Sequence, residues 1–193
     1  VAIERTATGP SLSRRSPAAA FQVCDALIDR AQCEALVAHA DLDPSAAASH
    51  DVKIDLTPAQ LHSIVGTDAV LEAILALGAT QLDANERLVW GATPRLILRR
   101  TGEANASPLE PHARCIRFHR DCSRAVVSIA LSEQHTGGQL LFAINGHLHS
   151  PACPVGSAVA HNRSAAHGVS HITSGVRYKL IAVFGQVDLA SAA

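Results

Sequence analysis

The second half of the chain breaks into a series of short β-compatible segments, and this division constrains the fold more than any other feature of the sequence. The boundaries between the segments carry Gly, Asn or Pro, which favour turns. Asn145-Gly146 is a strong signal for a two-residue hairpin. We predict strands near residues 125–131, 138–143, 147–150, 156–161, 167–172 and 176–184. Because these strands follow a helical start, the pattern indicates an α+β protein with a jelly-roll core buttressed by N-terminal helices.

The first half of the chain carries the helical signals. An imperfect apolar stripe runs from Asp25 to Asp43-Pro44. Thr57-Pro58 is typical of an N-cap followed by proline in the first turn, and we expect that helix to bury Leu61. A further helix is expected from about Val70 to Gly78. Short strands are also expected at residues 21–23 and 95–100.

Composition excludes several functional classes. The 193 residues are 48% hydrophobic and 17% charged, which is typical of one globular domain, expected over residues 21–193. Residues 1–20 are expected to form a flexible tail, with a trimmed transit segment as the alternative.

The net charge of -1 and the lack of a basic block argue against a nucleic-acid partner. No apolar run suits a membrane span. The five cysteines are scattered without a CxxC pair, which favours reduced thiols in a cytoplasmic protein. The oligomeric state stays open.

The candidate chemistry starts at His119 and Asp121. Residues two apart on a strand share a face, so an imidazole and a carboxylate would point side by side. The same alternation places Arg117 on this face, with Ile116 and Phe118 on the other. An HxD pair alone is a weak signal, because surface residues reach this spacing by chance.

The segments around this pair form an ordered series. After Asp121 come the apolar run 125–131, Gly137-Gly138 with the segment to 142, residues 154–159, His167-Gly168-Val169 and residues 173–180. In this order they resemble the 2-oxoglutarate- and Fe(II)-dependent dioxygenases, and within them the prolyl 4-hydroxylase-like branch. The resemblance is close over about residues 88–186. It implies a double-stranded β-helix (jelly-roll, cupin-like) core.

The resemblance also implies site residues and cosubstrates. His119, Asp121 and His167 would hold Fe(II), with His161 and His171 as rivals for the distal histidine. Arg177 would bind the distal carboxylate of 2-oxoglutarate. The expected reaction uses dioxygen to hydroxylate an unactivated C–H bond of an unidentified peptidyl or amino-acid-like substrate, with succinate and CO2 as co-products and ascorbate as a candidate reductant.

The chain departs from the family at Ala130, where several prolyl hydroxylases have a tyrosine that binds the same carboxylate. Ser128 shares that face. Lys179 would either replace the missing donor or carry its charge to solvent. Arg117 would meet an anion on the substrate or form a salt bridge with Asp121.

Three alternatives remain open from the sequence. A catalytically silent double-stranded β-helix could act as a binding module. A zinc hydrolase could use the same ligands, but would need a general base near the metal. Residues 103–112 would be either a lid over the site or a simple surface insertion.

Overall fold

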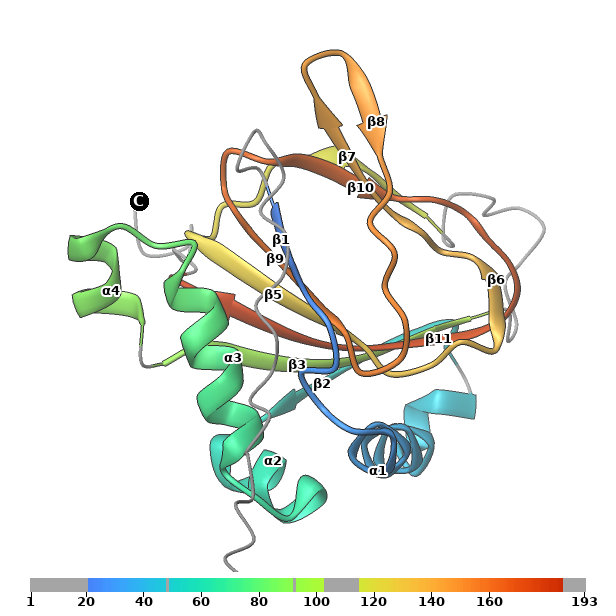
Figure 1. Cartoon of the computed structure of the whole chain (residues 1–193). Helices are drawn as coiled ribbons and strands as arrows, with labels where there is room; N and C mark the ends of the chain where they lie inside the picture. Colours follow the sequence, from blue (N-terminus) through green and yellow to red (C-terminus); the bar gives the residue numbers. More distant parts are fainter. Residues whose placement is uncertain (1–20, 48, 92, 103–114, 186–193) are drawn as a thin grey trace, which may run out of the picture.

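Two antiparallel sheets face each other across a cavity in the computed structural model, and helices lie behind the larger sheet (Figure 1). The structure describes residues 21–47, 49–91, 93–102 and 115–185. The predicted tail at 1–20 and the predicted lid at 103–112 lie outside the described residues.

The larger sheet has seven strands. Its order is β1 (Phe21–Cys24), β9 (Ala158–Asn162), β5 (Ala125–Ala130), β11 (Ile172–Phe184), β3 (Arg95–Gly102) and β2 (Asp51–Leu56), and β6 (His135–Gly137) pairs with β11. The smaller sheet has the order β4 (Ile116–His119), β10 (Ala166–Val169), β7 (Leu140–Ile144) and β8 (His147–His149). Sequential neighbours are often in different sheets, so the two sheets are built together.

Strand β11 shows how the two faces of the larger sheet differ. Its residues Tyr178, Leu180, Ala182 and Phe184 belong to the core beneath the helices. The alternating residues Arg177, Lys179, Ile181 and Val183 line the cavity. Because side chains of a strand point alternately to opposite faces, one strand supplies both an apolar core and charged groups to a ligand site.

The helices lie behind the larger sheet or to its side (Figure 1). They are α1 (Arg30–Asp41), the 3-10 helix η1 (Pro44–Ala47), α2 (Pro58–Val65), α3 (Ala69–Ala79) and α4 (Ala84–Trp90). Helices α1, α2 and α3 pack behind β3, β5 and β11 (Figure 1). The helical buttress is therefore confirmed. No helix in the described part of the chain is long and apolar enough to cross a membrane.

Local sequence signals account for several elements. The side chain of Thr57 accepts a hydrogen bond from the Gln60 amide, which confirms the predicted N-cap of α2. Asn145 and Gly146 both have positive φ, and they join β7 to β8 as the predicted hairpin. Cys24, Cys33, Cys122 and Cys153 are free thiols, as expected.

Other elements differ from the prediction. Helix α1 begins at Arg30 rather than near Asp25, because Ala26 has a positive φ and Asp29 caps the helix. Strand β2 and helix α4 were not predicted, although Asp83 and Glu86 form a capping box that signals α4.

Glycine has different roles at two predicted boundaries. Gly78 lies inside α3 rather than ending it, and a Cβ there would collide with the ring of Phe184. The strand expected at 138–143 begins at Leu140 as β7, and β6, which ends at Gly137, is an additional strand that was not predicted. Gly137 and Gly138 both have positive φ, so the chain turns between the two strands.

Candidate metal centre and cosubstrate cavity

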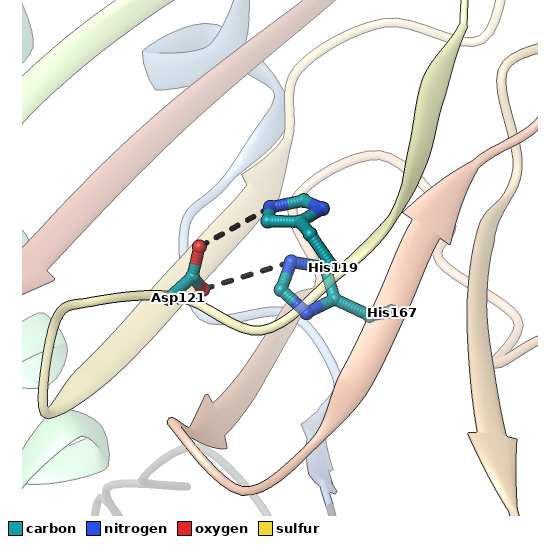
Figure 2. A group of neighbouring side chains, drawn as sticks. All are labelled: His119, Asp121 and His167. Atoms are coloured by element: carbon teal, nitrogen blue, oxygen red, sulfur yellow. Dashed lines mark ion pairs between the residues drawn. The ribbon is translucent and has the colours of Figure 1, made fainter.

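His119, Asp121 and His167 lie together at one side of the cavity (Figure 2). His119 ends β4 and is paired directly with His167 of β10. Asp121 lies two residues beyond His119, just outside the strand. Its Oδ1 is 3.3 Å from Nε2 of His119, and its Oδ2 is 3.6 Å from Nε2 of His167. The structure therefore brings together the three residues that the sequence resemblance selected.

Backbone carbonyls orient both imidazoles. Nδ1 of His119 lies 2.9 Å from the carbonyl oxygen of Arg117, and Nδ1 of His167 lies 3.1 Å from that of Ala165. A carbonyl oxygen only accepts, so Nδ1 of each ring is the donor to the backbone, and Nε2 is the nitrogen that faces Asp121. This is the arrangement that fixes the tautomer of metal-binding histidines.

The donor set suits a divalent transition metal. One ligand atom from each residue lies within 4.8 Å of the others. Two imidazoles and a carboxylate leave open coordination positions, as in non-haem Fe(II) oxygenases. The residues present therefore fit an iron site.

Strand β4 does not alternate regularly. His167 pairs with His119 and Val169 with Ile116, so two steps along β10 face three along β4. This bulge places Ile116, rather than Arg117, on the face that lines the cavity. Arg117 is exposed and does not line the cavity. The prediction that Arg117 projects into the barrel is therefore wrong, because the bulge interrupts the alternation.

The cavity has a volume of about 390 Å³ and extends from the three ligands to Arg177 and Lys179. Ser128 also lines it. A second chamber of about 380 Å³ shares Arg177, Lys179 and Leu140 with the first. The two cations therefore face an interior that continues beyond them.

Arg177 and Lys179 are deeply buried, at 7% and 6% exposure. Burial, followed by the charge of Arg99, lowers the pKa of Arg177 to about 10. Burial, followed by the charge of Arg177, lowers the pKa of Lys179 to about 8. Neither side chain has a hydrogen bond or an ion pair with another described residue. Of the two orientations considered for Lys179, the structure has the one that faces the cavity.

Ala130, which stands where several prolyl hydroxylases have a tyrosine, lies beside Lys179. Ala130 of β5 is paired directly with Lys179 of β11. The small side chain of Ala130 leaves space at this point, and Ala130 also lines the second chamber. Lys179, considered from the sequence as a replacement for the missing donor, therefore lies directly opposite Ala130.

The two rival histidines have different positions. His171 is exposed and does not line the cavity. His161 of β9 is 2% exposed, and its Nε2 lies 3.9 Å from Oδ2 of Asp121. Burial, followed by the neighbouring His167, lowers the pKa of His161 to about 4. His161 therefore lies beside the candidate metal site, although from the sequence it was considered only as a substitute for His167.

Two ion pairs on the cavity wall were not predicted. Arg95 donates to Asp55 over 2.6 and 2.9 Å, and Arg99 donates to Asp51 over 2.7 and 2.9 Å. Both carboxylates belong to β2, which the sequence pattern did not reveal.

The fold matches those of solved structures. No family model matches the chain, and no similar curated protein was found. A 2OG-Fe(II) oxygenase family oxidoreductase from Burkholderia pseudomallei is similar at 14% identity and a TM-score of 0.59, over 88% of this chain and 85% of that one. A Pseudomonas putida prolyl-4-hydroxylase is similar at 16% and 0.57, over 87% and 93%. The chain has the fold of the 2OG-Fe(II) oxygenases.

Another similar structure was solved with ligands bound. HygX from Streptomyces hygroscopicus, with nickel and 2-oxoglutarate bound, is similar at 12% identity and a TM-score of 0.58, over 88% of this chain and 84% of that one. These likenesses confirm the fold that the sequence resemblance implied, and prolyl 4-hydroxylases are among the structural neighbours.

Proposed function

We propose that this chain is an Fe(II)- and 2-oxoglutarate-dependent dioxygenase that hydroxylates an unactivated C–H bond of a peptidyl or amino-acid-like small-molecule substrate. Its two sheets would form a double-stranded β-helix within one domain spanning residues 21–193. His119, Asp121 and His167 would hold the metal.

The observation that carries this proposal is the joining of two features in one cavity. The cavity is lined by two histidines and a carboxylate that can bind a metal, and by two buried cations without an anionic partner among the described residues. Burying an unpaired charge is costly, so a ligand that supplies the anion stabilises the site. A 2-oxo diacid has a chelating end for the metal and a carboxylate for the cations.

The residues of the chain would have distinct roles. Arg177 would bind the distal carboxylate through its planar guanidinium. Lys179 would add a second donor where the family has a tyrosine, and Ser128 a hydroxyl on the neighbouring strand. Iron bound at this site would supply the oxidative chemistry with dioxygen, yielding succinate and CO2. The enclosing sheets would exclude water from the reacting groups.

Succinate formation tests this function. The protein would be incubated with Fe(II), 2-oxoglutarate, ascorbate and a panel of proline-containing peptides and free amino acids, and succinate would be quantified. We expect substrate-stimulated succinate from the wild type and none from Asp121→Ala, which retains the fold but lacks a ligand. Metal-dependent binding of 2-oxoglutarate without turnover on any substrate would instead identify a silent binding module.

A further inference from the structure

The second chamber is lined by the two buried cations of β11 but by none of the candidate metal ligands. Its volume is about 380 Å³, and the residues that it shares with the first cavity are Leu140, Arg177 and Lys179. The rest of its described wall comes from residues within 130–139 and from residues 150–153. A cosubstrate that chelates the metal in the first cavity therefore leaves this chamber unused.

The described wall of the second chamber contains cations and no carboxylate, since no Asp or Glu is among its lining residues. A thiolate of Cys153 would be an anion here. Burial, however, outweighs the charges of Lys179 and Arg177 and raises the pKa of the Cys153 thiol. The Sγ of Cys153 also donates to the carbonyl oxygen of Pro151 over 3.4 Å. The described wall therefore offers Lys179 no anion on this side.

A buried histidine nitrogen adds an unsatisfied group to the same chamber. His135 of β6 is paired with Gly175 of β11 and lines the chamber, and its Nδ1 is buried without a hydrogen-bond partner. A Cβ on Gly138 would lie 2.9 Å from Cδ of Arg177 and 3.5 Å from Cδ2 of His135, so both side chains lie close against this glycine. Burial, followed by the charges of Arg177 and Lys179, lowers the pKa of His135, so its ring is neutral at pH 7.

The proposed cosubstrate does not balance both cations. One carboxylate of 2-oxoglutarate belongs to the metal end, and only the other reaches Arg177 and Lys179. A single negative charge then meets two positive ones, and burying the remaining charge unpaired is costly. An ammonium group has three donors, so Lys179 can bind the cosubstrate carboxylate in the first cavity and another anion in the second.

We propose that the second chamber is a separate anion site, in which Lys179 and His135 bind a small carboxylate while 2-oxoglutarate occupies the first cavity. That this anion is additional to a cosubstrate rests on the proposed function, although the site itself uses no metal ligand. One residual positive charge suits a monoanion, and the two carboxylate oxygens suit an ammonium and a ring N–H. The chamber of about 380 Å³ far exceeds the roughly 10–15 Å³ that a single water needs.

Calorimetric titration with sodium acetate tests this site. The protein would first be loaded with Zn(II), which has no redox chemistry, and saturated with 2-oxoglutarate. We expect one acetate to bind per chain and to stay bound as 2-oxoglutarate is increased. Acetate that binds only without 2-oxoglutarate would overturn the inference, because it would then occupy the cosubstrate position. The absence of saturable acetate binding would overturn it as well.

Variants of the two donors locate the bound acetate. Lys179→Met should abolish measurable binding, and His135→Phe should weaken it about tenfold or more, since each loses a hydrogen bond to a charged group. His135→Gln keeps a donor and should bind more tightly than His135→Phe. Lys53→Met is the matched control, because Lys53 is exposed and lines only the first cavity. Thermal unfolding checks the fold of each variant. Equal acetate affinity in the wild type, Lys179→Met and His135→Phe would overturn the inference.

The outcomes for the two proposals are separable. Acetate binding without succinate formation on any substrate would contradict the dioxygenase function and leave the anion site standing. Succinate formation without acetate binding would contradict only the anion site. If His135→Phe weakened 2-oxoglutarate as much as acetate, the two ligands would share one site and the inference would be wrong.

Discussion

Two pairs of the cations that line the cavity differ in how their charge is balanced. Arg95 and Arg99 of β3 each donate two hydrogen bonds to an aspartate of β2. Arg177 and Lys179 of β11, the neighbouring strand, are more deeply buried and have no anionic partner among the described residues. The charges of Arg95 and Arg99, the β3 pair, are balanced within the fold. The charges of Arg177 and Lys179, the β11 pair, are left to be balanced by a ligand. A charged residue on the wall of a cavity therefore indicates ligand binding only when the fold itself does not neutralise it.

The largest effect is expected from Lys179→Met. This change removes an unpaired buried cation, so the ligand-free protein should gain stability at pH 7. A pKa lowered from 10.5 to about 8 corresponds to roughly 3 kcal/mol. Urea denaturation would measure the gain. The exposed Lys53 offers a control, because Lys53→Met should change stability little. A loss of stability in Lys179→Met would mean that the fold neutralises this charge after all.

Arg177→Ala should weaken 2-oxoglutarate binding far more than it weakens metal binding. The loss of a charge-assisted, two-bond contact costs about 2–3 kcal/mol, which is tenfold or more in affinity. Anaerobic calorimetric titration of the metal-loaded protein would measure both affinities. Arg95→Gln is the matched control, since Arg95 lines the cavity but already bonds Asp55. Equal losses in the two variants would show that the cosubstrate is not held by the β11 pair.

Asp51→Asn should lower the free energy of unfolding, whereas Lys179→Met should raise it. Burial raises the pKa of Asp51, but the hydrogen bonds and charge of Arg99 outweigh burial and hold the pKa below its ordinary value. Removing the carboxylate charge leaves Arg99 unbalanced beside Arg177, and we expect a loss of about 1–3 kcal/mol of unfolding free energy. Denaturation under the same conditions would measure it. Unchanged stability would indicate that the carboxylate of Asp51 does not balance the charge of Arg99.

The same comparison predicts a pH dependence carried by Lys179. Above a pKa of about 8 the free protein loses this charge, so the affinity for 2-oxoglutarate should fall by up to about tenfold per pH unit. The unfolded state binds more protons than the native state between pH 8 and about 10.5, so wild-type stability should rise there and approach that of Lys179→Met. Titrations at several pH values would show both trends. A pH-dependent affinity that persists in Lys179→Met would assign the effect to another group.

Much of the fold and part of the site followed from local sequence patterns. The Asn145-Gly146 hairpin and the Thr57 cap depend on neighbouring residues, and both were predicted. His119 and Asp121 followed from a two-residue spacing, and the resemblance selected His167 as their partner. Arg117 was misplaced because its orientation depends on a bulge opposite β10, which no local pattern reports.

The sequence by itself determined the series of short strands, the helical start and the types of residue able to bind a metal and a carboxylate. These depend on turn residues, apolar periodicity and side-chain chemistry within a few positions of one another. Only the tertiary structure decided which cations are paired, because Asp51 meets Arg99 across 48 residues of chain through the register of β2 with β3. It also decided that Lys179 points inward opposite Ala130 and that the buried His161 lies beside Asp121. Each of these depends on strands that are distant in sequence and adjacent in the sheet, where contact follows register rather than spacing along the chain.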